Sequence, residues 1–240
     1  MTGKYYRIAR ESSLKIGRHQ GLIYLQGLCR KADKVLDVGC GEGSRLNHLL
    51  PGKSGLGVDP SPAAIKLAVR QYPRHNFLLG TGEQLPLADN SFDLVYTAFA
   101  VEHCQNPEAF ISEMIRVCRS DGRLVILCPN YGAPNRRSPV SVQSPPAKLT
   151  LGIIKDLFPS AGLNWRPITP RNSYQQIDDD TTFEPYLLSL IRFLYTYPVI
   201  IEKASSLWEI EPKPDKLYKY FFKVFKYWGP QIFVCARKII

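Results

Sequence analysis

Short apolar runs alternate with segments of helical spacing through the first half of the chain. The runs predict strands at residues 34–38, 55–59, 76–80, 93–97 and 123–128. The segments between them predict helices at residues 44–50, 62–71 and 108–118, where apolar positions recur on one side. Nearly continuous apolar strands that alternate with helices are typical of a parallel sheet covered on both faces.

The pattern changes after Pro129. Residues 130–182 are rich in Pro, Ser, Asn and Arg, with short apolar pieces such as 149–158. Because this stretch is long for a plain loop, we expect an inserted cap. Regular spacing then predicts a helix at 186–197, with Thr181 and Glu184 as a capping box, strands at 199–203 and 231–237, and a helix at 215–228.

The length of 240 residues is compatible with a single α/β domain. We divide it into an N-terminal helical cap (1–32), a core (33–130), an inserted substrate cap (131–182) and a C-terminal part of the sheet (183–240). Residues 216–228 alternate lysines with aromatic residues. We expect the aromatic side chains to pack on the sheet, and peripheral contact with an anionic membrane stays open as an alternative.

Charge and cysteine content limit the partners and the cellular compartment that the sequence predicts. The net charge is +10, with basic residues concentrated towards both ends, which fits either solubility or an anionic partner. No apolar run reaches the ~18 residues of a membrane span, and residues 1–6 are polar and charged, unlike a signal peptide. The six cysteines form no Cys-x-x-Cys pair, so we expect free buried thiols in a cytoplasmic protein.

A glycine-rich turn connects the first predicted strand to the first predicted helix. Its sequence is Asp37-x-Gly39-x-Gly41-x-Gly43. Such a turn lets backbone N–H groups and a helix N-terminus approach a ligand. The spacing is one residue tighter than the Gly-x-Gly-x-x-Gly of dinucleotide folds, which disfavours a nicotinamide-dependent dehydrogenase.

Further motifs occur in order at the ends of the later strands and just before the fifth strand. They are Gly57-Val58-Asp59-Pro60, Gly80-Thr81-Gly82-Glu83, Val101-Glu102-His103 and Asp121-Gly122. Together with the glycine turn, this series resembles the ubiquinone/menaquinone-biosynthesis-type group of class I S-adenosylmethionine (SAM) methyltransferases. The resemblance is dense over residues 33–130 and thinner over residues 229–238.

The resemblance implies a Rossmann-like, seven-stranded, mostly parallel sheet with helices on both faces and an antiparallel last strand. It implies SAM as the cofactor. The glycine turn would hold the methionine part, Asp59 both ribose hydroxyls, and residues 81–83 the adenine. Thr81 stands where the family often has Asp, which predicts weaker cofactor binding. The implied cofactor-binding residues are Asp37, Gly39, Cys40, Gly41, Gly43, Asp59, Pro60, Thr81, Gly82, Glu83, Ala98 and Phe99.

The acceptor side is predicted from position at the carboxyl edge of the sheet. His103 is the candidate general base or acceptor-orienting group, with a structural helix-start residue as the alternative. We expect Glu102 to be a solvated or capping acid. The candidate substrate residues are Tyr131, Asn130, Arg137 and His19, against the alternative of exposed turn and helix positions.

Three adjacent acids occupy positions 178–180. Adjacent carboxylates do not converge on a cation without help from other segments. We expect them to lie before a helix N-terminus, where negative charge is favourable, and we predict no metal site.

These observations predict a SAM-dependent methyltransferase that methylates an oxygen of a small-molecule or lipid- or glycan-linked acceptor. Two alternatives stay open. One is an RNA methyltransferase that uses the basic surface, and nucleic acid is the less favoured partner. The other is a SAM-binding regulatory protein without catalysis. A monomer and a homodimer are equally compatible with the sequence.

Overall fold

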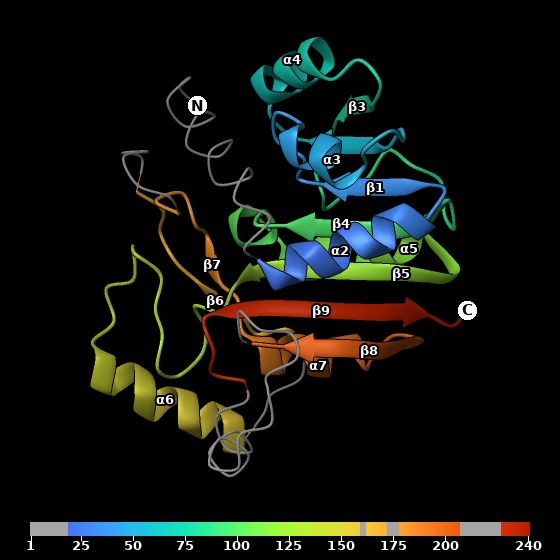
Figure 1. Cartoon of the computed structure of the whole chain (residues 1–240). Helices are drawn as coiled ribbons and strands as arrows, with labels where there is room; N and C mark the ends of the chain where they lie inside the picture. The colour runs from blue at the N-terminus through green and yellow to red at the C-terminus, as the bar shows by residue number, and fades with distance from the viewer. Residues whose placement is uncertain (1–18, 159–161, 172–177, 207–226) are drawn as a thin grey trace.

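The computed structural model describes residues 19–158, 162–171, 178–206 and 227–240 (Figure 1). The strands of its main sheet are β1 (Val35–Val38), β2 (Leu56–Asp59), β3 (Asn76–Leu79), β4 (Phe92–Ala98), β5 (Cys118–Pro129), β8 (Val199–Ser205) and β9 (Gln231–Lys238). They form one seven-stranded sheet in the order β3-β2-β1-β4-β5-β9-β8.

Strand directions confirm the predicted fold class. β1 runs parallel to β2 and β4, β2 parallel to β3, and β4 parallel to β5. The last strand, β9, is antiparallel to both β5 and β8. Asp37 of β1 is in register with Gly57 on one side and Tyr96 on the other. The carboxyl ends of β1, β2 and β4 therefore open at the same edge of the sheet.

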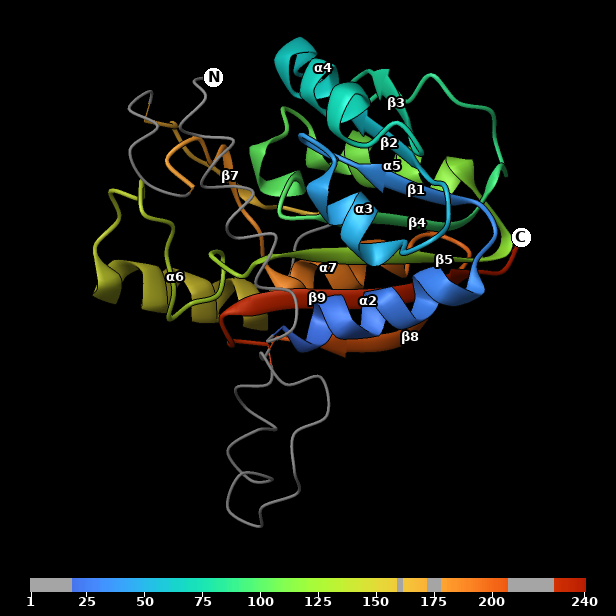
Figure 2. The ribbon, with the colours of Figure 1, turned by 45° about the horizontal axis from the view of Figure 1, so that its top comes forward.

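Helices cover both faces of this sheet (Figure 2). α2 (Gln20–Lys31) and α3 (Ser44–Leu49) pack on one face, while α5 (Pro107–Val117) and α7 (Leu187–Leu194) pack on the other. Strand β4 shows the alternation that this requires, because Leu94 and Tyr96 join the α2–α3 core and Val95 joins the α5–α7 core. α4 (Pro62–Gln71) packs against β2 and β3.

Two helices begin where their capping residues place them. The Ser61 hydroxyl accepts a hydrogen bond from the backbone N–H of Ala64 at 3.3 Å, and Pro62 follows as the first residue of α4. The Asn106 side chain accepts from the N–H of Ala109 at 3.1 Å, and Pro107 begins α5. The prediction for residues 62–71 is confirmed at both ends, and the Ser61 cap with Pro62 explains where this helix begins.

The capping-box prediction for α7 is wrong. The helix begins at Leu187, with Tyr186 as its N-cap residue. The Glu184 carboxylate instead accepts hydrogen bonds from Lys148 Nζ at 2.7 Å and from the Ser138 N–H at 3.0 Å. A buried lysine needs a counter-charge, and this requirement outweighs the local helix-start pattern.

The placement of residues 178–180 at a helix N-terminus is also wrong, because they precede β7 (Phe183–Glu184). β7 pairs antiparallel with β6 (Arg166–Pro167). The predicted helix at 215–228 lies almost wholly outside the described residues, and Trp228, which is described, is not helical.

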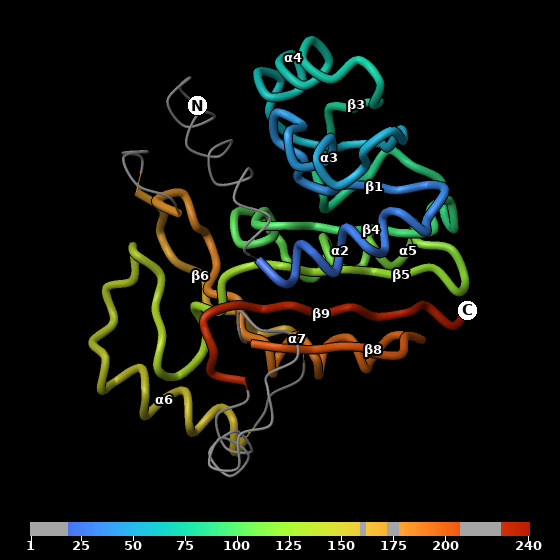
Figure 3. The backbone as a smooth tube through the Cα atoms, viewed as in Figure 1, coloured from blue at the N-terminus to red at the C-terminus, as the bar shows by residue number. Residues whose placement is uncertain are grey.

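Beyond the carboxyl ends of β4 and β5, the chain forms α6 (Pro145–Leu157) and the β6–β7 pair before it returns to α7 (Figure 3). α6 turns one buried charged side chain towards the protein and exposes several large apolar side chains. Lys148 is its buried residue. The exposed large side chains of this helix are Leu149, Leu151, Ile153, Ile154 and Leu157.

All six cysteines are buried and free, as predicted. Within the described ranges, no helix has the length and apolar character needed to cross a bilayer.

Candidate functional site

The glycine turn joins β1 to α3 with left-handed backbone conformations. Gly39 has φ +81° and Gly41 has φ +55°, a region that side chains disfavour. A Cβ on Gly39 would lie 2.3 Å from the Cβ of Ala100, whereas a Cβ on Gly41 would have no atom within 4 Å. Gly39 therefore packs against the loop after β4, and Gly41 leaves open space beside the turn.

Asp59 ends β2 and faces this turn. Its Oδ2 accepts a hydrogen bond from the Gly41 N–H at 2.8 Å, and its Oδ1 accepts from the Ser61 N–H at 2.9 Å. Burial raises the pKa of Asp59, and the two backbone donors oppose that shift. Each carboxylate oxygen keeps a second lone pair for a further donor. Pro60, the next residue, is exposed.

Asp37 is buried beneath the turn. Neither of its carboxylate oxygens has a hydrogen-bond partner among the described residues. Burial raises the pKa of Asp37 to about 7, opposed by the positive charge of Arg45 and by the neighbouring Tyr96 hydroxyl. A buried unpartnered carboxylate is costly, so this position suits a ligand group that carries positive charge or N–H donors. Cys40, in the turn, is itself buried, and its thiol occupies the space where a side chain on Gly57 would lie.

Residues 81–83 follow β3, and the first of them is exposed while the other two contact the rest of the protein. Thr81 is exposed. Gly82 is packed, since a Cβ there would lie 2.1 Å from the Phe110 ring. The Glu83 Oε1 accepts from the backbone N–H groups of Gln105 at 2.7 Å and Asn106 at 3.4 Å. Glu83 thus connects this segment to the loop after β4.

The end of β4 has an unusual backbone and several polar neighbours. Phe99 has φ +57°, which is rare for a non-glycine residue. Its ring contacts His19 edge-on with centroids 5.8 Å apart, and the Arg45 guanidinium lies 5.4 Å from its centroid. Arg45 also donates to the carbonyl of Ala98. His19 is therefore brought to the mouth of the site, where its Nδ1 caps α2 by accepting from the Leu22 N–H at 3.4 Å.

His103 ends the short 3₁₀ turn η2 (Val101–His103) and is surrounded by carboxylates. Its Nδ1 lies 3.2 Å from Asp180 Oδ1, and its Nε2 lies 4.0 Å from Asp178 Oδ1. The Tyr131 hydroxyl donates to Asp178 Oδ2 at 2.5 Å. Residues 178–180 and Tyr131, predicted as unrelated features, thus meet at His103.

The charge state of His103 follows from these neighbours. Burial alone would lower its pKa, but the hydrogen bond to Asp180 and the charges of Glu102 and Asp178 raise it to about 9. The imidazole is therefore protonated near pH 7 in this arrangement. A protonated ring can orient an acceptor or pair with an anion.

Glu102 differs from the prediction of a solvated or capping acid. Its side chain is 0% exposed, and neither carboxylate oxygen has a hydrogen-bond partner within the described part of the chain. Burial raises the pKa of Glu102 to about 7, opposed by the positive charge of His103. The sequence offers no sign of this burial, because the residues that cover η2 come from the distant cap: the Thr182 N–H donates to the Glu102 carbonyl at 2.9 Å.

The prediction of Asn130 as a substrate residue is corrected. Asn130 is fully buried, and its amide donates to the carbonyls of Tyr227 and Gly229 at 2.7 Å each. Its Oδ1 accepts from the Leu187 N–H at 3.1 Å. The side chain therefore joins the two ends of the cap segment. Arg137 is exposed on the cap and donates to the Gln143 carbonyl at 3.4 Å.

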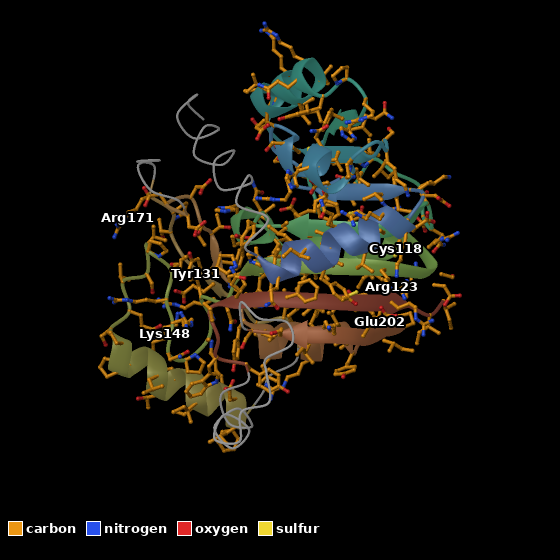
Figure 4. All side chains as sticks on the ribbon, in the orientation of Figure 1. Cys118, Arg123, Tyr131, Lys148, Arg171 and Glu202 are labelled. Carbon is orange, nitrogen blue, oxygen red and sulfur yellow. The ribbon has the colours of Figure 1, made fainter. Side chains whose placement is uncertain are left out.

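A cavity of about 310 Å³ lies beneath α6, a feature that the sequence did not indicate. Its charged lining residues are Lys148, Lys155, Asp156, Arg166, Glu184 and Arg192. Lys148 Nζ donates to the Tyr131 carbonyl at 2.5 Å as well as to Glu184. Figure 4 shows Tyr131 and Lys148 on neighbouring parts of the cap. Tyr131 therefore contacts both the cavity wall, through its carbonyl, and the His103 cluster, through its hydroxyl.

Comparison with known proteins agrees with this geometry. Residues 36–126 match the family described as methyltransferase domain. Norajmaline N-methyltransferase of Rauvolfia serpentina is 30% identical over 70% of this chain and 62% of that protein. Demethylmenaquinone methyltransferase of Renibacterium salmoninarum is 34% identical over 39% of this chain and 40% of that protein. The chain thus spans less than two thirds of these relatives.

Solved structures agree on the fold. The crystal structure of an S-adenosylmethionine-dependent methyltransferase from Mesorhizobium loti matches with a TM-score of 0.53 and 15% identity, over 85% of this chain and 90% of that chain. Residues 36–126 carry a methyltransferase domain, and the fold is that of solved SAM-dependent methyltransferases. SAM is the cofactor of this class, as the sequence motifs predicted.

Proposed function

We propose that this protein transfers the methyl group of SAM to an oxygen of a small-molecule or lipid-linked acceptor, bound between the carboxyl end of β4 and the cap. The main support is the pairing of Asp59 with the glycine turn, which leaves both carboxylate oxygens able to accept hydroxyl donors. In this proposal Asp59 binds the two ribose hydroxyls. Asp37 faces the positively charged methionine end, and the exposed Thr81 borders the adenine.

SAM supplies a methyl group already activated by its sulfonium. The protein has to bind the cofactor, align the acceptor and exclude water. The acceptor oxygen forms a bond to the methyl carbon, the carbon–sulfur bond breaks with its electron pair going to sulfur, and the hydroxyl proton passes to solvent water. His103 and Tyr131 lie in the loops after β4 and β5, where they can orient that oxygen.

The outer face of α6 supports an apolar or lipid-linked acceptor. Ile154 is 48% exposed and Leu157 is 68% exposed, while the inward-facing Lys148 and Asp156 line the cavity. A helix with this orientation presents apolar surface outside the protein, which is the arrangement of elements that rest on a bilayer surface or bind an apolar chain.

A nitrogen acceptor is the second candidate. Norajmaline N-methyltransferase is a nitrogen methyltransferase by name. The three carboxylates around His103 also favour a product that gains positive charge. The two candidates differ in the atom that carries the new methyl group.

Two experiments test the proposal. Calorimetric titrations with SAM and with NAD should show binding of SAM, and binding of NAD alone would refute the assignment. Incubation with methyl-labelled SAM and a fractionated cell extract should place label in lipid or small metabolites, together with S-adenosylhomocysteine. Label in RNA would support the RNA alternative. SAM binding without any S-adenosylhomocysteine would support a regulatory protein.

A further inference from the structure

A buried carboxylate without a hydrogen bond stands next to the acceptor side of the site, with His103 Nε2 3.9 Å away as its ion-pair partner. The Glu102 side chain is 0% exposed, and both of its oxygens lack hydrogen-bond partners in the described residues. Native proteins pair nearly all such groups, often with an ion or water. The position of Glu102 therefore points to a bound group that satisfies it.

The neighbouring ligand atoms converge on one point. Glu102, His103 and Asp178 each offer one atom, and all three atoms lie within 4.8 Å of one another. His103 Nε2 is 3.9 Å from Glu102 Oε1 and 4.0 Å from Asp178 Oδ1. Two ligands bound to one ion at about 2.1 Å and at a tetrahedral angle are roughly 3.4 Å apart. Side-chain movements that shorten the two histidine–carboxylate distances by roughly half an ångström, and the carboxylate–carboxylate distance by at most about 1.4 Å, would therefore bring the atoms to bonding distance.

Two further contacts orient these atoms. The Asp180 carboxylate lies 3.2 Å from His103 Nδ1, which leaves Nε2 directed at Glu102 and Asp178. The Tyr131 hydroxyl holds the other oxygen of Asp178 at 2.5 Å. Metal-binding histidines characteristically donate their second ring N–H to a carboxylate, and ligating carboxylates are hydrogen-bonded in turn.

We propose that Glu102, His103 and Asp178 bind one divalent transition-metal ion, with Asp180 and Tyr131 as supporting residues. One imidazole and two carboxylates form a mixed nitrogen and oxygen donor set, which suits Mn²⁺, Fe²⁺ or Zn²⁺ better than a soft-metal site. Adjacent aspartates alone do not converge, which is why the sequence predicted no metal. The fold supplies the missing ligands, because the cap carries Asp178 to the end of η2.

The inference rests on the proposed function for the role of the ion. Three protein ligands leave coordination positions for an acceptor oxygen, and a bound cation lowers the pKa of a hydroxyl that it ligates. This deepens the proposal of an oxygen acceptor: the site would select acceptors whose hydroxyl can bind a metal. The competing occupant of the cluster is the proton on His103 Nε2, which a metal ion must displace.

The test uses the full chain, stripped with a chelator, and titrates it with Co²⁺ alone and Mn²⁺ alone. We expect one ion per chain. Binding is seen as cobalt d–d absorption and as loss of the electron paramagnetic resonance signal of free Mn²⁺. The single variants Glu102→Gln and Asp178→Asn should each weaken binding at least ~100-fold. Asp180→Asn should weaken it about 10-fold to 100-fold, the range measured for supporting carboxylates elsewhere. Asp89→Asn, at an exposed acid outside the cluster, is the matched control and should bind like the wild type.

The outcomes separate the metal site from the methyltransferase proposal. Equal affinity in wild type, Glu102→Gln and Asp178→Asn would overturn the metal site, as would the absence of stoichiometric binding. If Glu102→Gln does not fold, the part-exposed Asp178→Asn and the Zn²⁺-induced change of the His103 Nε2 nitrogen resonance decide. SAM binding is measured separately by calorimetry. A metal site without SAM binding would refute the proposed function while leaving the ion site in place.

Discussion

The carboxylate of Asp59 and the backbone N–H of Gly41 are joined by a hydrogen bond of 2.8 Å across the turn between β1 and α3. This contact places the acid at the mouth of the open space beside Gly41. If Asp59 binds ribose, Asp59→Ala removes two charge-assisted hydrogen bonds, each worth about 1.5–3 kcal/mol. SAM affinity should then fall more than ~100-fold. Calorimetry on Asp59→Ala, with Asp89→Asn as control, measures this loss. An unchanged dissociation constant would mean that ribose binds elsewhere.

Gly39 and Gly52 allow backbone strain to be separated from steric contact. Both have positive φ, +81° and +77°, but a Cβ on Gly39 would lie 2.3 Å from Ala100, whereas Gly52 has nothing within 4 Å. Gly52→Ala should cost only the left-handed penalty of about 1–2 kcal/mol. Gly39→Ala should cost at least ~1 kcal/mol more, because the loop after β4 must move. Urea denaturation of both variants tests this, and equal losses would count against the Gly39–Ala100 contact.

His103 should make stability depend on pH. Its pKa is raised from 6.5 to about 9 in the folded protein, so its stabilising effect is complete below pH 6.5 and is lost as pH rises to about 9. The shift corresponds to roughly 3 kcal/mol at most. In the presence of a chelator, wild type should lose more stability between pH 6.5 and 9.5 than His103→Asn. Parallel pH profiles for the two proteins, from urea denaturation, would show that His103 does not carry the predicted charge.

The Lys148–Glu184 pair should stabilise the cap. The two side chains are 7% and 0% exposed and 2.7 Å apart, and burial lowers the pKa of Lys148. Lys148→Met leaves the Glu184 charge buried, with Arg166 at 3.7 Å as the nearest remaining cation. We expect a loss of about 3–5 kcal/mol. Combining Lys148→Met with Glu184→Gln should recover part of it in thermal and urea denaturation. A double variant as unstable as Lys148→Met would argue against a charge effect.

The outer face of α6 should mediate any contact with a bilayer. Ile154→Glu and Leu157→Glu place charges on exposed apolar positions and should reduce binding to vesicles of mixed neutral and anionic lipids about 10-fold or more. Val69→Glu, at a 53% exposed position on α4, is the matched control. Sedimentation with vesicles measures the difference. Equal binding by all three variants, or no binding by the wild type, would exclude this face as a lipid contact.

Local signals allowed much of the fold to be predicted. Ser61 and Pro62 define the start of α4 by contacts within the helix itself, and continuous apolar runs identify the buried strands. The same locality explains the failure at Glu184. The four-residue capping pattern carries no information about Lys148, which lies 36 positions away and takes the carboxylate.

The acceptor-binding part of the site could not be predicted, for the same reason. Glu102 and Asp178 come together because the cap returns to η2, through contacts such as the hydrogen bond from the Thr182 N–H to the Glu102 carbonyl. Sequence position placed His103 and Tyr131 near the carboxyl edge, but it could not show that carboxylates surround the imidazole. It also placed Asn130 there without revealing that its amide is buried and fully engaged.

The Asn130 amide has a consequence for protein engineering. It hydrogen-bonds to the N–H of Leu187, so the cap segment begins after β5 and ends at the start of α7 at nearly the same point. Such a segment is a natural graft unit. A chimaera that keeps Asn130 and Leu187 and takes the intervening residues from a relative should retain the host's cofactor affinity and inherit the donor's acceptor preference.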